Sequence, residues 1–169
     1  MQYPLVLEYV KTLIPHREPF IFIDEISFMY DRETVMKNPD LSKINAKEDW
    51  TSVISAKRYY DTEKDNFLKG HFPEFAIVPG VILVESIAQT AACMMGIIQG
   101  VGGVKSPLVK INNAKFKTPV RPGDTAIMTV YAMSNSRKPM FNFYGNVSVN
   151  GKVCAEAEIT AMAIDIGKY

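Results

Sequence analysis

Residues 70–99 read GHFPEFAIVPGVILVESIAQTAACMMGIIQ, and this stretch decides the fold. From Val81 to Gln99 the run is apolar on nearly every side of a helix, which is typical of a helix buried in a protein core or a bilayer. Its length of about eighteen residues just reaches that of a membrane span. However, Glu85 and Gln89 lie one helical turn apart within it, and a carboxylate is costly to insert into lipid. The stretch therefore predicts a buried helix in a soluble protein, with one polar stripe and no membrane span.

The residues around the start of this helix suit catalysis. The first N–H groups of a helix have no internal acceptor and lie at the positive end of its dipole, so Gly80 after Pro79 can stabilise a developing negative charge. His71 lies just upstream, and Glu85 lies inside the helix. Alone, such a histidine is commonly structural and a Pro-Gly pair is commonly only a turn. Together, the three groups predict a catalytic site.

These motifs resemble those of a known family. Gly70-His71-Phe72-Pro73, residues 77–81 and residues 85–89 are similar to the signature of the 3-hydroxyacyl-[acyl-carrier-protein] dehydratases of the FabZ type. His71 and Glu85 have the family's separation for its catalytic pair, and the related dehydratase/isomerase branch, FabA, carries Asp at the second position. Residues 14–24 resemble the family's opening, where we expect His16 to be structural. The resemblance covers most of the chain outside 31–49.

The whole chain of 169 residues predicts one domain. Its 47% hydrophobic and 22% charged residues are typical of a globular protein, and a net charge of +1 gives no argument for nucleic acid. We found no N-terminal secretory pattern, and the two cysteines fit small core residues rather than a disulfide framework. A cytoplasmic location is therefore expected.

The remaining pattern predicts an α+β fold in which an antiparallel sheet of about six strands wraps the long helix. A first short helix is expected over residues 4–13, and Asn150-Gly151 predicts a two-residue hairpin. The resemblance implies that this is the hotdog fold, with a polar insertion at about 31–49 that could be a flap, a subunit contact or an inert excursion. The expected strands cover residues 20–30, 50–60, 108–118, 126–134, 140–149 and 152–164.

The resemblance implies dehydration of a (3R)-3-hydroxyacyl thioester to the trans-2-enoyl thioester, in fatty acid or related acyl-chain biosynthesis, without a metal or cofactor. An imidazole titrates near neutrality, which suits His71 as the base for the α-proton. Desolvation favours a protonated carboxyl group, which suits Glu85 as the acid for the departing hydroxyl. Contacts with substrate are expected from Gly80 through its N–H, and from Gln89, Phe72 and Pro79.

The partners implied are an acyl carrier protein and a second copy of the chain. Residues 105–138 carry seven basic residues against one acidic residue, so we expect an acidic carrier to dock there, with Arg121, Arg137 and Lys138 as contacts. Protection of strand edges from aggregation is the alternative explanation for these charges. The resemblance also implies at least a homodimer, in which His71 and Glu85 of one site come from different subunits, and in many members a trimer of dimers.

At two positions the sequence departs from the family's pattern, and two other functions are alternatives to dehydration. Phe75 stands where the family frequently has His, and Ala76 where it usually has Pro, so we expect an effect on substrate preference rather than on the reaction. A hotdog thioesterase would use a helix carboxylate to activate water, and a non-catalytic acyl-binding subunit would show no turnover. The His71-Phe72-Pro73 element favours elimination over both.

Overall fold

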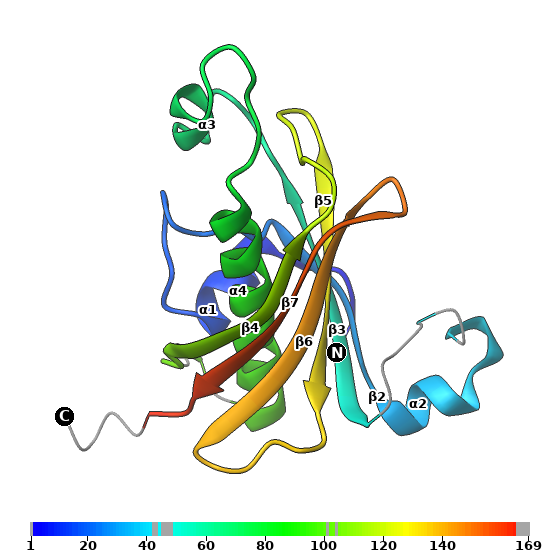
Figure 1. Cartoon of the computed structure of the whole chain (residues 1–169). Coiled ribbons are helices and arrows are strands. Elements are labelled where there is room, and N and C mark those ends of the chain that lie inside the picture. Colours follow the sequence, from blue (N-terminus) through cyan, green and yellow to red (C-terminus); the bar gives the residue numbers. More distant parts are fainter. Residues whose placement is uncertain (1, 42–43, 45–48, 101, 104, 165–169) are drawn as a thin grey trace.

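The computed structural model describes residues 2–41, 44, 49–100, 102–103 and 105–164 (Figure 1). Its elements form one curved sheet and one long helix, with shorter helices at the margins. In chain order they are β1 (Leu5–Val6), α1 (Leu7–Leu13), β2 (Glu25–Asp31), α2 (Arg32–Lys37), the 3-10 turn η1 (Pro39–Leu41), β3 (Trp50–Tyr59), α3 (Phe67–Gly70), α4 (Gly80–Gln99), β4 (Leu108–Phe116), β5 (Thr125–Met133), β6 (Met140–Val149) and β7 (Lys152–Met162).

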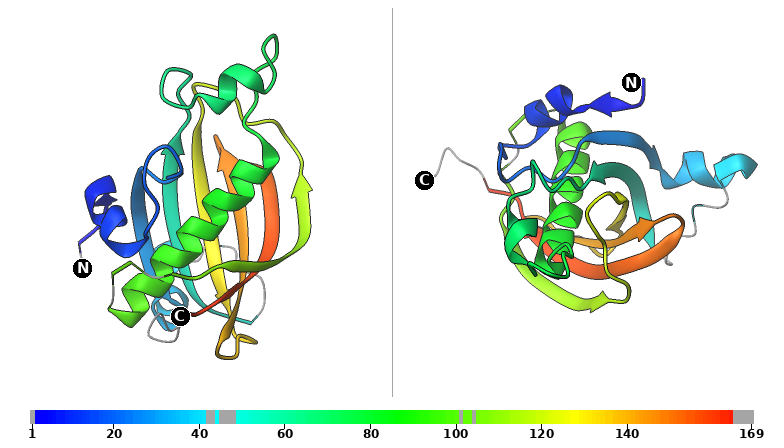
Figure 2. Two further views of the ribbon diagram at one scale, coloured as in Figure 1. Left: turned by 90° about the vertical axis from the view of Figure 1, so that its left-hand side faces the viewer. Right: turned by 90° about the horizontal axis from the view of Figure 1, so that it is seen from above.

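All strands belong to one antiparallel sheet in the order β1-β2-β3-β5-β6-β7-β4. The sheet curls around α4, which lies across its inner face, and α1 lies beside α4 at one flank (Figure 2). The edge strands are therefore β1 and β4. The predicted long helix within an antiparallel sheet is confirmed, with seven strands in place of six because Leu5 and Val6 pair with the start of β2.

The helix α4 is the centre of the core. By length and mean hydropathy it could cross a membrane, but 67% of its most apolar window is buried inside the fold. Alternate residues of the inner strand faces pack against it; for example, Ile87 and Val130 are both fully buried. Gly100, with a φ of 65°, ends the helix in the left-handed conformation, which a glycine adopts without steric cost.

Two sequence-based boundaries were wrong at the N-terminal side. The expected first helix starts only at Leu7, since the two residues before it form β1. The expected strand at 20–30 starts only at Glu25, and the preceding residues form a loop in which residues 21–23 are buried and Phe20 is exposed. In that loop the Gln89 amide replaces ladder hydrogen bonds, accepting from the Phe22 N–H (2.8 Å) and donating to the Phe20 carbonyl (3.1 Å).

The described part of the 31–49 insertion packs on the outer face of the sheet. Asp31 caps α2 by accepting a hydrogen bond from the Thr34 N–H (2.7 Å), a contact that lowers the pKa of the Asp31 carboxyl. Val35 of α2 joins a small outer cluster with Trp50 and Tyr131. The sequence analysis did not anticipate α2, and residues 42–43 and 45–48 of the insertion lie outside the described part of the chain.

Candidate active site

His71 is positioned by a loop that is tied down on both sides. Before it, the buried Asp65 accepts a hydrogen bond from the Arg58 guanidinium of β3 (2.6 Å). After it, the Ile77 N–H donates to the His71 carbonyl, and His71 Nδ1 lies 3.0 Å from the Ile77 carbonyl oxygen. A carbonyl oxygen only accepts, so Nδ1 carries the proton. His71 Nε2 is thereby left unprotonated in the neutral ring, as a base requires.

His71 lines a cleft of about 480 Å³ at the N-terminal end of α4. Pro79 and Gly80 also line it, and its opposite wall is formed by residues 116–120. At Gly80 a Cβ atom would lie 2.7 Å from the Phe116 ring, so the glycine allows that ring to approach the helix. As the first residue of α4, Gly80 has no intrahelical acceptor for its N–H. The cleft is therefore lined by an imidazole and by the first residue of α4, whose N–H has no acceptor within the helix.

Glu85 occupies a different surface of α4. Its side chain is 23% exposed, and Gln89 Nε2 donates to its Oε1 atom (3.0 Å). His16 Nε2 lies 3.4 Å from the same oxygen. The expectation that His16 is structural stays a prediction, and the structure adds that its imidazole approaches the predicted acid. The sequence signal was present in the motif at residues 14–20, but it did not say which side chain His16 meets.

Gln89 and Phe72 are not placed as substrate contacts in the cleft. Gln89 is 1% exposed, so it holds Glu85 and the 20–22 backbone rather than lining the cleft that His71 lines. Phe72 stacks on the His71 ring with a centroid separation of 4.2 Å and is 53% exposed. Glu85 is likewise outside the residues that line the His71 cleft. Within the described part of one chain, the cleft that the predicted base lines does not include the predicted acid.

The three predicted docking residues are not brought together in one chain. Arg121 lies just before β5 in the sequence, and β5 starts at the end of the sheet where α4 begins (Figure 1). The Arg121 guanidinium lies 4.5 Å from the centre of the Phe75 ring. Arg137 and Lys138 lie in the hairpin after β5, at the opposite end. A strand of nine residues spans about 30 Å, so the basic segment does not form a single face.

A hydrogen bond between the side chains of Ser86 and Tyr60 also holds α4 in place. Tyr60 Oη and Ser86 Oγ lie 3.1 Å apart in the core, and burial raises the pKa of Tyr60 to about 12. The phenol thus stays neutral and serves as a hydrogen-bonding anchor between β3 and the helix. Among the described residues, no group of three or more His, Cys, Asp or Glu side chains is arranged to hold a metal ion.

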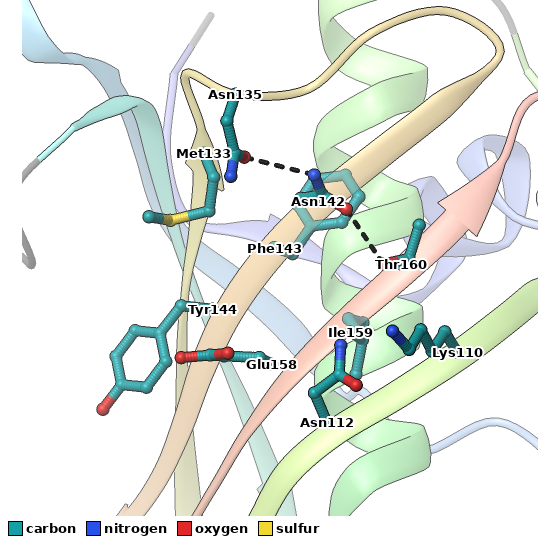
Figure 3. A pocket seen from close by; sticks show the side chains of 10 residues that line it. All are labelled: Lys110, Asn112, Met133, Asn135, Asn142, Phe143, Tyr144, Glu158, Ile159 and Thr160. Atoms are coloured by element: carbon teal, nitrogen blue, oxygen red, sulfur yellow. Dashed lines mark hydrogen bonds between the residues drawn. The ribbon is translucent and has the colours of Figure 1, made fainter.

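A separate polar cavity of about 320 Å³ lies on the outer face of the sheet (Figure 3). Asn142 crosses it, donating to Asn135 (3.1 Å) and accepting from Thr160 (2.9 Å). The strands separate this cavity from α4, which lies behind them in the view. It therefore does not belong to the site of His71 and Glu85.

Comparisons with known proteins agree with the resemblance. A family model described as a FabA-like domain matches residues 14–158. The 3-hydroxyacyl-[acyl-carrier-protein] dehydratase FabZ of Polynucleobacter asymbioticus is 32% identical over 162 residues, covering 95% of this chain and 95% of the relative. That of Agrobacterium fabrum is 35% identical over 163 residues, covering 96% and 92%.

Solved structures support the fold. The dehydratase heterocomplex ApeI:P from Xenorhabdus doucetiae is similar with a TM-score of 0.69 over 99% of this chain and 95% of that chain, at 13% sequence identity. The regions aligned with these relatives and with this solved structure cover nearly the whole chain, so they include α4 and the sheet around it. The chain belongs to the FabA-like family, and its relatives there are 3-hydroxyacyl-[acyl-carrier-protein] dehydratases of the FabZ type.

Proposed function

We propose that this chain is a 3-hydroxyacyl-[acyl-carrier-protein] dehydratase, converting (3R)-3-hydroxyacyl thioesters to trans-2-enoyl thioesters in fatty acid or related acyl-chain biosynthesis. Its family membership supports the reaction class. The single structural observation that carries it is the 3.0 Å contact between His71 Nδ1 and the Ile77 carbonyl. That contact leaves Nε2 as a base beside the free end of a buried helix.

The proposed chemistry needs three groups. His71 Nε2 removes a proton from the α-carbon, and the Gly80 N–H donates to the thioester oxygen as negative charge develops there. The electron pair of the broken C–H bond forms the double bond as the β C–O bond breaks. Glu85 gives its proton to the departing hydroxyl, so water leaves, and the proton held by His71 returns through solvent to restore Glu85. The balance closes without an oxidant or reductant.

We further propose that each active site is shared between two copies of the chain, in a dimer that can assemble further into a trimer of dimers. The separation of Glu85 from the His71 cleft supports a shared site. The edge strand β4 also exposes Ile111 (50%) and Phe116 (56%), while Val81 on α4 is 72% exposed. A second copy at this edge would cover these apolar side chains and pair with the edge of β4 that faces away from β7.

The acidic carrier protein is proposed to dock near Arg121. The guanidinium lies on the ring of Phe75, in the loop that holds His71, so a bound carrier would present its acyl chain to the adjacent cleft. Phe75 thus provides a stacking surface for Arg121, and together with Ala76 it is proposed to affect substrate preference. Arg137 and Lys138 remain docking candidates only through another subunit, because β5 separates them from Arg121.

The remaining proposals concern the chain as a whole. We propose a single domain in which the described part of the 31–49 insertion adds a small cover to the outer sheet face, as the clustering of Val35 with Trp50 supports. Both cysteines, Cys93 and Cys154, are free and buried, which fits a reducing, cytoplasmic compartment. No step of the proposed reaction calls for a cofactor.

The test is an assay of the purified protein with a 3-hydroxyacyl thioester, following enoyl absorbance and thiol release together. The dehydratase is expected to form the enoyl product with no free thiol. Thiol release without the enoyl product would identify a thioesterase instead. No turnover by the folded protein, on carrier-bound and small thioesters alike, would identify a non-catalytic acyl-binding subunit.

A further inference from the structure

His16 is fixed in place close to Glu85. Arg17 donates from its guanidinium to the His16 carbonyl (2.7 Å) and to the Ile14 carbonyl (3.0 Å), which holds the backbone of this turn. The His16 ring stacks with Phe20 at a centroid distance of 6.4 Å. Gln89 binds the backbone at Phe20, so the loop is tied directly to α4. The imidazole therefore reaches Glu85 from a loop that is anchored on both sides.

The surroundings of His16 Nδ1 indicate which of the two ring nitrogens carries the hydrogen. Nδ1 is buried and has no hydrogen-bond partner among the described residues. A buried N–H without an acceptor is costly, which favours the tautomer that carries its hydrogen on Nε2. His16 Nε2 lies 3.4 Å from Glu85 Oε1, which is longer than an ordinary hydrogen bond. Hydrogen bonds in catalytic sites are commonly long without substrate and shorten when substrate binds.

Two donors thus converge on one oxygen of Glu85. Gln89 Nε2 and His16 Nε2 both approach Oε1, while within the described part of the chain no donor contacts Oε2. A proton on Oε1 would face both N–H groups. The protonated carboxyl group must therefore carry its hydrogen on Oε2.

We propose that His16 is a positioning residue that, with Gln89, holds Glu85 Oε1 as a permanent acceptor and so makes Oε2 the oxygen that delivers the proton. This inference rests on the proposed role of Glu85 as the acid. It gives the motif at residues 14–17 a function in the reaction, through a side chain 69 positions away in the sequence. The substrate hydroxyl would meet Oε2 and not the anchored oxygen.

The test compares two amides at position 16. His16→Gln can place an N–H near the position of Nε2, whereas the shorter His16→Asn reaches only the position of Nδ1. His16→Asn removes one of the two donors to Oε1 and leaves only that of Gln89, so Glu85 is held less firmly. The kcat of His16→Asn is therefore expected to fall about 10- to 100-fold with little change in KM. His16→Gln is expected to recover most of kcat. Melting curves of both variants check the fold.

A double-mutant cycle with Glu85→Gln separates positioning from a general structural effect. If His16 acts through Glu85, adding His16→Asn to Glu85→Gln is expected to cause no further loss. Wild-type kcat in folded His16→Asn, or the same fold-loss in both backgrounds, would overturn the proposal. If His16→Asn does not fold, a His16→Gln variant with kcat as low as that of Glu85→Gln would overturn it as well. Near-normal turnover of Glu85→Gln alone would instead remove the acid assignment on which the proposal rests.

Discussion

Gly145, in the middle of β6, allows α4 to lie close against the sheet. A Cβ atom built there would lie 2.4 Å from Ile87 Cγ2, and 3.2 Å from both Ile87 Cγ1 and Val130 Cγ2. Apolar carbons pack at about 3.5–4.0 Å, so Gly145→Ala would push the helix and the strand apart by about 1 Å. Both neighbours are fully buried and cannot move into solvent.

The expected cost follows from two opposing effects. Overpacking a dense core costs about 1–3 kcal/mol, and replacing a strand glycine by alanine returns about 0.5–1 kcal/mol. An approach of 2.4 Å is severe, so the overpacking cost is expected in the upper part of its range, at about 2–3 kcal/mol. We therefore expect Gly145→Ala to lower the free energy of unfolding by about 1–2.5 kcal/mol. Glu85 lies two residues before Ile87, so kcat is expected to fall with the stability.

The assay is urea unfolding followed by circular dichroism, at one protein concentration because a dimer's stability depends on it. The control is Ile87→Ala, which removes both contacted carbons and alone costs about 2–5 kcal/mol. Combined with Gly145→Ala, its cost is expected to be less than additive by about 1–3 kcal/mol. A neutral or stabilising Gly145→Ala, or strict additivity in the double variant, would refute the close helix–sheet contact.

Three further predictions test the site. Glu85→Gln is expected to lower kcat by on the order of 10²-fold while far-ultraviolet circular dichroism is unchanged, since the amide can still accept from its neighbours; full activity would show that the carboxyl group is dispensable. Asp65→Ala is expected to cost about 3 kcal/mol in urea unfolding, because it leaves the buried Arg58 with only one partner carboxylate; a change below about 0.5 kcal/mol, the scale of an exposed pair, would contradict this. Arg121→Glu is expected to raise KM for carrier-bound substrate but not for small thioesters, an effect that high salt should reproduce; equal losses on both substrates would argue against docking at Arg121.

Local signals in the sequence predicted the central elements well. A run that is apolar on nearly every side predicted α4, and Gly100, the residue after the run, ends the helix. Asn150 and Gly151 both adopt positive φ (50° and 77°), as a two-residue hairpin of this type requires. These features depend on neighbouring residues only, so they can be predicted from the sequence without knowing the tertiary contacts.

The features that were missed depend on distant contacts. Leu5 and Val6 form a strand only because β2 offers its edge, although their local pattern continues that of a helix. His16 meets Glu85 only because Gln89 binds the intervening loop to α4. No pattern in either segment specifies that pairing.

The expectation that the basic residues of 105–138 lie on one face was also wrong, but for a different reason. Arg121 and Lys138 are close in sequence, and counting charges along the chain placed them on one surface. The extended strand β5 carries them to opposite ends of the sheet. Charge counts need the direction of each strand before they define a docking face.

The shared active site is the central claim, and mixing two inactive variants tests it most directly. His71→Ala and Glu85→Ala are each expected to be inactive, and refolding equal amounts together gives about half heterodimers by random pairing. Each heterodimer would hold one intact site and one site lacking both groups, so about a quarter of wild-type activity is expected to return. If both residues act within one chain, a mixture shown by mass to contain heterodimers will remain inactive, and that result would contradict the account.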